Sequence, residues 1–259
     1  RTTLNGEGLQ HEDGHSHIMA NTIPNCVSYD PTFAHEVGVI LHHGLKRMVE
    51  KQDNVFYYLT LLNENYAMPG LTPGTEEQII KGMYMCKPGA AGDKRVQLLG
   101  SGTILRESIA AQTLLATDWG IQADVWSCPS FNELTRDGQD ADRWNLLHPL
   151  ETPRVPFVAE QLNKSTGPVV ASTDYMKAYA EQIRPFVPKG RTYKVLGTDG
   201  FGRSDSRKKL RHFFEVDRHF VVLAALEALA DRGEIEPKVV ADAIVKFGIN
   251  PEKRNPLDC

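Results

Sequence analysis

The sequence lacks the features that mark several large classes of protein. Its four cysteines lie far apart and form no C-x-x-C pair, so they favour reduced thiols over a disulfide framework or a structural zinc site. No apolar run approaches the roughly 20 residues that a membrane-spanning helix needs. The formal net charge of -4 gives no electrostatic reason to expect a nucleic acid or an anionic membrane as a partner.

What is present is the composition of a globular protein. The 259 residues are 41% hydrophobic and 24% charged, which allows one large domain or two ordinary ones with a real core. The chain opens with Arg1 rather than methionine, and its most reactive-looking loop, residues 5–15, follows almost at once. Because chain ends fray unless something holds them, we expect the chain to be a fragment of a longer protein that supports this loop.

The first part of the chain shows a strand, helix, strand pattern. Residues 55–60 are rich in aromatic and branched side chains, which favours a strand, and residues 26–29 form a shorter run of the same kind. Between them, Asp30 followed by proline predicts the start of a helix. Apolar residues then recur at helical spacing from 33 to 48, and the opposite face, which carries three histidines and Glu36, is predicted to face solvent.

A turn-rich segment interrupts the pattern, which then resumes. Residues 63–94 hold many prolines and glycines around a short helical piece at 76–81, and they are the best candidate for a connection between domains. Beyond them the predicted strands are 96–99, 123–127, 168–171 and 193–197. The predicted helices are 103–117, 157–163, 175–183, 217–233 and 237–248, and 131–147 is interpreted as a loop with a short helix. This alternation predicts an α/β fold of three α/β/α layers with mostly parallel sheets.

The opening loop contains the candidate catalytic residues. Residues 5–15 hold three glycines, three acids and two histidines, and such loops often carry chemistry. His11, Glu12 and His15 match H-E-x-x-H, in which a helix directs both histidines to a zinc ion. Gly14 lies inside the motif, and glycine costs about 1 kcal/mol in a helix interior. A zinc metallopeptidase is therefore kept only as an alternative.

Two further glycine-rich segments follow predicted strands. Gly100-Ser-Gly102 opens a helix and offers backbone N–H groups to a phosphate, but Leu105 occupies the last glycine position of G-x-G-x-x-G, and a tight strand-to-helix turn explains the segment as well. Residues 197–207, with three glycines before a predicted helix, are compatible with an anion site, a partner surface or a capped connection. Their role stays open.

Several long motifs together resemble one enzyme family. The chain resembles the homodimeric-type pyruvate dehydrogenase first component, the thiamine-diphosphate-dependent, transketolase-like decarboxylase of bacterial pyruvate dehydrogenase complexes. The motifs that carry the resemblance run in order along essentially the whole chain: Asn5-Gly-Glu-Gly-Leu-Gln-His-Glu-Asp-Gly-His15, Leu62-Asn-Glu-Asn-Tyr66, Val96-Gln-Leu-Leu-Gly-Ser-Gly102, Leu147-His-Pro-Leu-Glu-Thr-Pro-Arg-Val-Pro156, Ala171-Ser-Thr-Asp-Tyr-Met176 and the glycine-rich segment 197–207.

The resemblance implies a domain division and a set of site residues. Residues 1–85 correspond to the last part of a pyrimidine-binding domain, and residues 86–259 to a complete transketolase-like C-terminal domain. His11 is expected over the cofactor's thiazolium ring, as a proton donor, acceptor or orienting group. Glu7 is expected to be an active-centre glutamate, so both are catalytic and cofactor-binding candidates, and His15 is a further catalytic candidate. An imidazole can move protons near neutral pH, and a nearby carboxylate can raise its pKa.

The resemblance also implies an activity, cofactors and partners. The activity is oxidative decarboxylation of pyruvate with reductive acetylation of the lipoyl group on a dihydrolipoyl acetyltransferase core. It belongs to a bacterial cytoplasmic complex that includes dihydrolipoyl dehydrogenase and links glycolysis to acetyl-CoA. Thiamine diphosphate and Mg²⁺ are the implied cofactors, but the motif that binds Mg²⁺ and the diphosphate is absent from this chain. No metal ligand is therefore predicted here, and we expect the 259 residues alone to be inactive.

An alternative role for the chain is non-catalytic. Transketolase-like enzymes build each active site between two subunits, so this portion is also a candidate dimerisation module of a homodimer. The helical faces of residues 30–50 and 217–247 are the expected contact surfaces.

Overall fold

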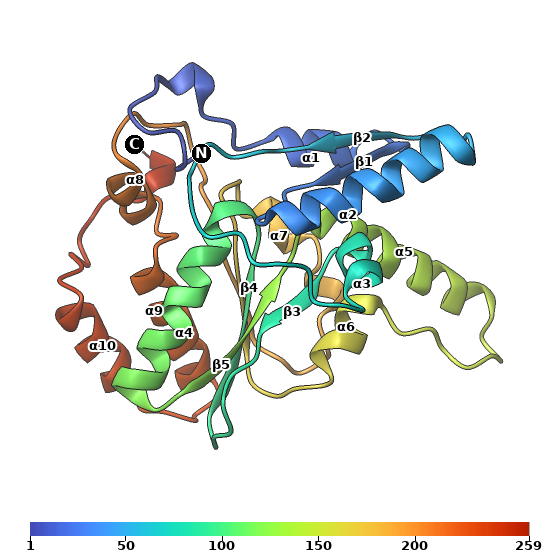
Figure 1. Ribbon diagram of the computed structural model, residues 1–259. Helices are drawn as coiled ribbons and strands as arrows, with labels where there is room; N and C mark the ends of the chain where they lie inside the picture. Colours follow the sequence, from blue (N-terminus) through green and yellow to red (C-terminus); the bar gives the residue numbers. More distant parts are fainter. Residues whose placement is uncertain (259) are drawn as a thin grey trace.

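The strands of the protein form two sheets, shown in Figure 1 for the computed structural model, which describes residues 1–258. The smaller sheet pairs two parallel strands, β1 (Cys26–Tyr29) and β2 (Phe56–Leu59). The larger sheet has the order β3-β5-β4-β6-β7, and only β3 runs antiparallel to its neighbour. Its strands are β3 (Tyr84–Lys87), β4 (Arg95–Gly100), β5 (Gln122–Ser127), β6 (Val169–Ser172) and β7 (Tyr193–Leu196). The mostly parallel arrangement is confirmed.

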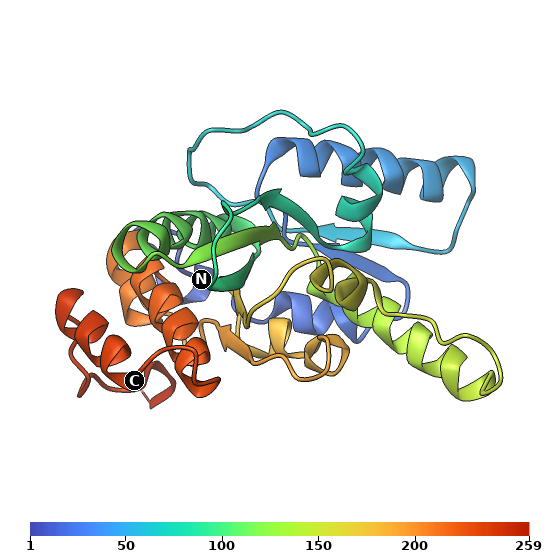
Figure 2. The same cartoon turned by 90° about the horizontal axis from the view of Figure 1, so that it is seen from below.

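Helices cover both faces of the larger sheet, so the predicted three layers are confirmed. They are α1 (Ser16–Asn21), α2 (Ala34–Leu45), α3 (Glu76–Lys81), α4 (Leu105–Trp119), α5 (Phe131–Leu147), α6 (Phe157–Leu162), α7 (Ala178–Glu181), α8 (Arg207–Phe213), α9 (Arg218–Asp231) and α10 (Pro237–Lys246). Figure 2 shows α4, α9 and α10 at one end of the molecule and α5 reaching out at the other. Within residues 1–258, no helix is both long and apolar enough to cross a bilayer.

Alternation along the central strand β4 separates the two cores of the larger sheet. Leu98 is buried with apolar residues of α4 and α9, whereas Leu99 is buried with residues of α5, α6 and α7. Successive side chains of a strand point to opposite faces, so the strand contributes to both cores. A third cluster, around Tyr29, Ile40 and Ile79, packs α2 and α3 against the smaller sheet. Because Tyr84 of β3 belongs to this third cluster, the smaller sheet packs near the β3 edge of the larger one.

The start of α2 differs from its prediction. Asp30 does not cap the helix, which begins at Ala34. Its side chain instead accepts hydrogen bonds from Thr60 and Ser101, which directly follow β2 and β4. Glu36 is fully buried rather than solvated. One of its oxygens accepts from the backbone N–H groups of Thr32 and Phe33, and the other from the Ser127 and Tyr84 hydroxyls. Four donors satisfy this carboxylate, which a pattern of apolar spacing does not reveal.

Two elements were missed in the sequence. Residues 131–147 form one continuous helix, α5, rather than a loop, and it starts where Ser130 Oγ accepts from the Glu133 N–H at 3.0 Å. Strand β3 lies inside the segment predicted as a connection and crosses the predicted boundary after residue 85.

The helix predicted at 175–183 is only the short α7, because the backbone at Tyr175 and Met176 bonds to Thr198 and Gly14. The division into two domains stays a prediction.

Candidate functional site

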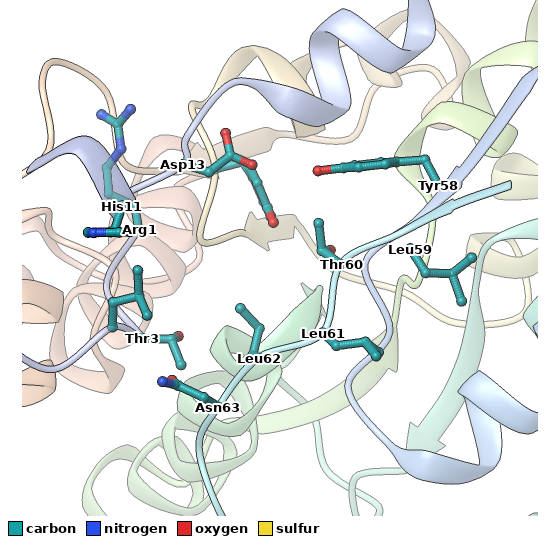
Figure 3. A pocket seen from close by; sticks show the side chains of 12 residues that line it. Arg1, Thr3, His11, Asp13, Tyr58, Leu59, Thr60, Leu61, Leu62 and Asn63 are labelled. Atoms are coloured by element: carbon teal, nitrogen blue, oxygen red, sulfur yellow. The ribbon is translucent and has the colours of Figure 1, made fainter. Parts of the chain in front are cut away.

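A cavity of about 370 Å³ lies between the opening loop and the end of β2. Figure 3 shows Arg1, His11 and Asp13 on one side and the segment from Tyr58 to Asn63 on the other. The full lining is Arg1, Thr3, Leu4, His11, Asp13, Tyr58, Leu59, Thr60, Leu61, Leu62, Asn63 and Tyr175. Residues at the carboxyl end of a parallel strand are well placed to form ligand sites, and Thr60 to Asn63 directly follow β2. The cavity is therefore a candidate active site.

The structure places His11 in the lining of this cavity. Residues Leu9–His11 form a single 3₁₀ turn, closed by the His11 N–H donating to Gly8 O at 3.0 Å. The side chain is exposed, and no other residue among 1–258 hydrogen-bonds to its ring. An exposed, unengaged imidazole that lines a cavity is free to exchange a proton with a bound molecule. Its catalytic role stays a prediction.

The other two candidates, Glu7 and His15, do not line the cavity. Glu7 is exposed, and no hydrogen bond or ion pair joins it to His11 within residues 1–258. His15 Nδ1 lies 3.2 Å from the Arg1 guanidinium, which itself lines the cavity. That guanidinium packs so closely under Gly14 that an added Cβ there would lie 2.2 Å from it. The His15 ring therefore reaches the site through Arg1.

Asp13 is a site residue that the sequence analysis missed. Its Oδ1 accepts from the N–H groups of His15 and Ser16 at 2.9 and 3.0 Å, and its other oxygen bonds to the Ser16 hydroxyl. Desolvation raises the pKa of Asp13, but these hydrogen bonds outweigh it and the pKa is lowered overall. Asp13 therefore brings a negative charge to the same cavity wall as His11. An acid three residues before the serine that opens α1 was the available signal.

Beneath the cavity, polar side chains form a buried network at the ends of four parallel strands. Asp30, Thr60, Ser101 and Thr173 directly follow β1, β2, β4 and β6. The two oxygens of Asp30 accept from Thr60 Oγ1 and Ser101 Oγ, both at 2.8 Å, and Ser101 Oγ lies 3.0 Å from Thr173 Oγ1. Burial raises the pKa of Asp30 to about 7, although the two hydroxyls oppose the shift. Asp30 thus joins both sheets under the cavity.

His17 extends this network behind the cavity. Its Nε2 lies 2.9 Å from Thr60 Oγ1, and its ring stacks on Tyr179 and meets Tyr175 edge-on. Burial lowers the pKa of His17 to about 4, so the ring is neutral at pH 7. Because the Thr60 hydroxyl donates to Asp30, it accepts from His17, which places the ring proton on Nε2. The neutral His17 ring therefore fixes Thr60, which lines the cavity.

The two motif alternatives find no support in the geometry. The H-E-x-x-H segment forms a 3₁₀ turn and a bend rather than one helix, and no group of three metal-ligating side chains occurs among the described residues. The turn at Gly100 to Gly102 is buried. Gly102 has φ +51°, its N–H donates to Asp30 O, and an added Cβ would lie 2.7 Å from the Asp30 carboxylate. The segment is a strand-to-helix turn that packs on Asp30.

Comparisons with known proteins agree with this geometry. Residues 1–69 match the model of the pyruvate dehydrogenase E1 component middle domain, and residues 82–217 match the transketolase-like TK C-terminal domain. The chain belongs to the transketolase-like family. A transketolase from Pichia stipitis has the same fold, with a TM-score of 0.60 and 16% identity over 90% of this chain and 29% of that one.

Curated relatives are far more similar in sequence. The pyruvate dehydrogenase E1 component of Pseudomonas aeruginosa is 66% identical over 100% of this chain, and that of Escherichia coli K12 is 63% identical over 99%. The chain spans 29% of the length of each of these relatives. The resemblance to the pyruvate dehydrogenase first component is thus confirmed.

Proposed function

We propose that these residues form part of the first component of a pyruvate dehydrogenase complex. The high identity to E1 components along the whole chain carries the proposal, and the cavity beside His11 supports it. The activity is oxidative decarboxylation of pyruvate with transfer of the acetyl group to a lipoyl group. Because the chain spans 29% of its relatives' length, it contributes one part of the active site rather than a complete one.

The residues present fit one part of thiamine diphosphate. An imidazole and a carboxylate face aromatic and apolar side chains across the cavity, a lining suited to a flat cationic ring with a small organic acid beside it. The described residues hold no acidic cluster for Mg²⁺, so the diphosphate and its metal need ligands from elsewhere. When bound, the cofactor supplies the carbanion that attacks the 2-oxo carbon of pyruvate.

The chain's own contribution is to move and hold protons and to exclude water. His11 donates or accepts the proton at the reacting oxygen, because its ring is unengaged and faces the cavity. Asp13 adds a carboxylate to the same wall, where it can attract a cationic part of a bound molecule. Tyr58 and Tyr175 add aromatic surface to the cavity lining, which lowers the local dielectric and strengthens charge interactions there.

The proposal includes a cytoplasmic, homodimeric enzyme that works with an acetyltransferase core and dihydrolipoyl dehydrogenase. The apolar residues of α9 are buried in the chain's own core. The part of the predicted dimer face that α9 supplies is therefore not available to a partner. Leu41, Leu45 and Val49 are each half or more exposed, and they form a row along α2 and the π-helix Lys46–Glu50 that follows it. This stripe is the better candidate for a contact outside the chain.

The test separates the fragment from the whole enzyme. Calorimetry with thiamine diphosphate and Mg²⁺ is expected to show no tight binding to the 259-residue chain, because the metal ligands are missing. In the full-length enzyme, His11→Ala is expected to lower kcat by about 10²-fold or more, as removal of a positioned general acid or base does. Micromolar cofactor binding by the isolated chain, or an unchanged kcat in His11→Ala, would contradict the proposal.

A further inference from the structure

The glycine-rich segment 197–207, here named the clamp loop, holds the opening loop from outside. The Gly6 N–H donates to Asp205 O at 3.0 Å, and the Arg207 Nε–H donates to Thr3 O at 2.6 Å. The Arg207 N–H also donates to Asn5 Oδ1 at 3.3 Å. The two loops lie about 200 positions apart in the sequence and are joined on both sides of the turn that carries His11.

The clamp loop also contacts Glu12, the residue after His11. Glu12 is 6% exposed, and its Oε2 accepts from the Arg203 N–H. Gly202 lies against the same side chain: an added Cβ would be 2.7 Å from Glu12 Oε2 and 2.8 Å from Glu12 Cβ. The demand for glycine at 202 is therefore steric, since a Cβ has no room beside Glu12.

The buried Glu12 carboxylate is energetically costly at this position. Its Oε1 is buried and has no hydrogen-bond partner within residues 1–258, and burial raises the pKa of the Glu12 carboxyl. A buried, half-satisfied carboxylate lowers stability relative to an apolar or amide side chain. An unsatisfied polar group of this kind points to a role other than stability.

We propose that Glu12 is a positioning residue for His11. Held between Gly202 and Arg203, it fixes the backbone on the carboxyl side of the 3₁₀ turn, so that the neighbouring exposed imidazole stays at the cavity that it lines. The clamp loop is then the outer support of the catalytic turn, which gives residues 197–207 a function. This inference rests on the proposed function, in which His11 acts on the bound substrate.

The variants separate the contact from general stability. In the full-length enzyme, Glu12→Ala removes the acceptor, Gly202→Ala crowds it, and Glu12→Gln keeps an amide oxygen for the Arg203 N–H. Gly38→Ala is the matched control, because Gly38 lies in α2 with nothing within 4 Å of an added Cβ. We expect Glu12→Ala and Gly202→Ala to lower kcat at least tenfold with little change in KM for pyruvate. Glu12→Gln is expected to recover most of that loss.

Two readouts distinguish positioning from folding. His11→Ala is expected to abolish one limb of the pH profile of kcat. Glu12→Ala should lose or shift the same limb, and Gly38→Ala should keep it. Because Glu12 and Gly202 form one contact, the double variant should be no worse than the poorer single one. If Gly202→Ala does not fold, the comparison of Glu12→Ala with Glu12→Gln decides the matter alone.

Amide hydrogen exchange tests the clamp without using activity. Glu12→Ala is expected to speed exchange in residues 5–12 and at Arg203, and Glu12→Gln is not. If His11→Ala stays active, the proposed function fails while the exchange result still tests the clamp. If His11→Ala is inactive but Glu12→Ala matches the parent enzyme in kcat, pH profile and exchange, the inference is overturned.

Discussion

At the scale of single residues, the site is surrounded by buried polar groups whose partners come from distant parts of the sequence. Asp30 bonds to Thr60 and Ser101, and Glu12 to Arg203. None of these pairs is adjacent in sequence, and each ties one strand end or loop to another. Removing a partner from such a group leaves a buried polar atom unsatisfied, which costs about 1–3 kcal/mol.

Asp30 predicts a pH dependence of stability. Its pKa, raised to about 7 by burial, lies above the roughly 3.9 expected in the unfolded chain. The protonated form is therefore favoured by folding, and its contribution is full below about pH 4 and lost as the pH rises to about 7. The shift corresponds to a few kcal/mol at most, at about 1.36 kcal/mol per pH unit.

Urea unfolding between pH 4 and 8 tests this prediction. Asp30→Asn should remove the part of the decline in unfolding free energy that belongs to this group, while Asp93→Asn, at an exposed loop position, should leave the decline in place. If both variants follow the parent curve over this range, Asp30 does not titrate as stated.

His11 illustrates what sequence could supply at this scale. Its position follows from a motif resemblance that local sequence carries, and the structure places it at the cavity. Asp13 lies in the same loop but was not selected, and Asp30 was assigned to a helix cap that it does not form. Glu12 matched a zinc motif, yet its partners lie near position 200. Such roles depend on tertiary contacts, which spacing in one sequence does not encode.

At the scale of secondary structure, the strands other than β3 were predictable, and α5 was not. Those strands are short apolar runs bounded by turns, and their predicted bounds agree with the structure to within one or two residues. Helix α5 buries only a few side chains, such as Phe131 and Leu134, among many charged ones, and it contains Gly138. Glycine normally weakens a helix, so it suggested a break where the structure has close packing.

Gly138 gives a prediction at this scale. A Cβ there would lie 2.4 Å from Cγ of the buried Phe186 ring, so Gly138→Ala must displace that ring or α5. Overpacking of this kind typically costs about 1–3 kcal/mol, against a gain of up to about 1 kcal/mol from helix propensity.

The comparison with a second helical glycine separates these effects. Gly38→Ala lies in α2 with open space around the added Cβ and should be neutral or stabilising. The free energies of unfolding of the two variants should therefore change in opposite directions or differ clearly. Equal changes would mean that α5 and Phe186 adjust freely.

At the scale of the whole molecule, an ion-pair network joins the segment after β2 to helices that cover the larger sheet. Arg211 is buried between Glu64 and Glu107, and Glu107 also pairs with Arg218. Desolvation works to raise the pKa of Glu64, but Arg211 and Arg106 outweigh it and lower that pKa. The network ties the segment after β2 to α4, α8 and α9 near the outer side of the cavity.

Because the charges are buried, loss of Arg211 should matter far more than loss of a surface cation. Arg211→Ala removes the buried cation that Glu64 and Glu107 share, but Glu64 keeps Arg106 and Glu107 keeps Arg218, so we expect a cost of about 1–3 kcal/mol. Lys238→Ala breaks an exposed pair with Asp242, one turn apart on α10, and should cost about 0.5 kcal/mol or less. Urea unfolding at pH 7 compares the two variants directly.

As the pH falls through the lowered pKa of Glu64, the stabilisation from its charge is lost, so the difference in unfolding free energy between the parent protein and Arg211→Ala should narrow in acid. A constant difference from pH 7 to below pH 4 would show that Arg211 acts through packing rather than charge.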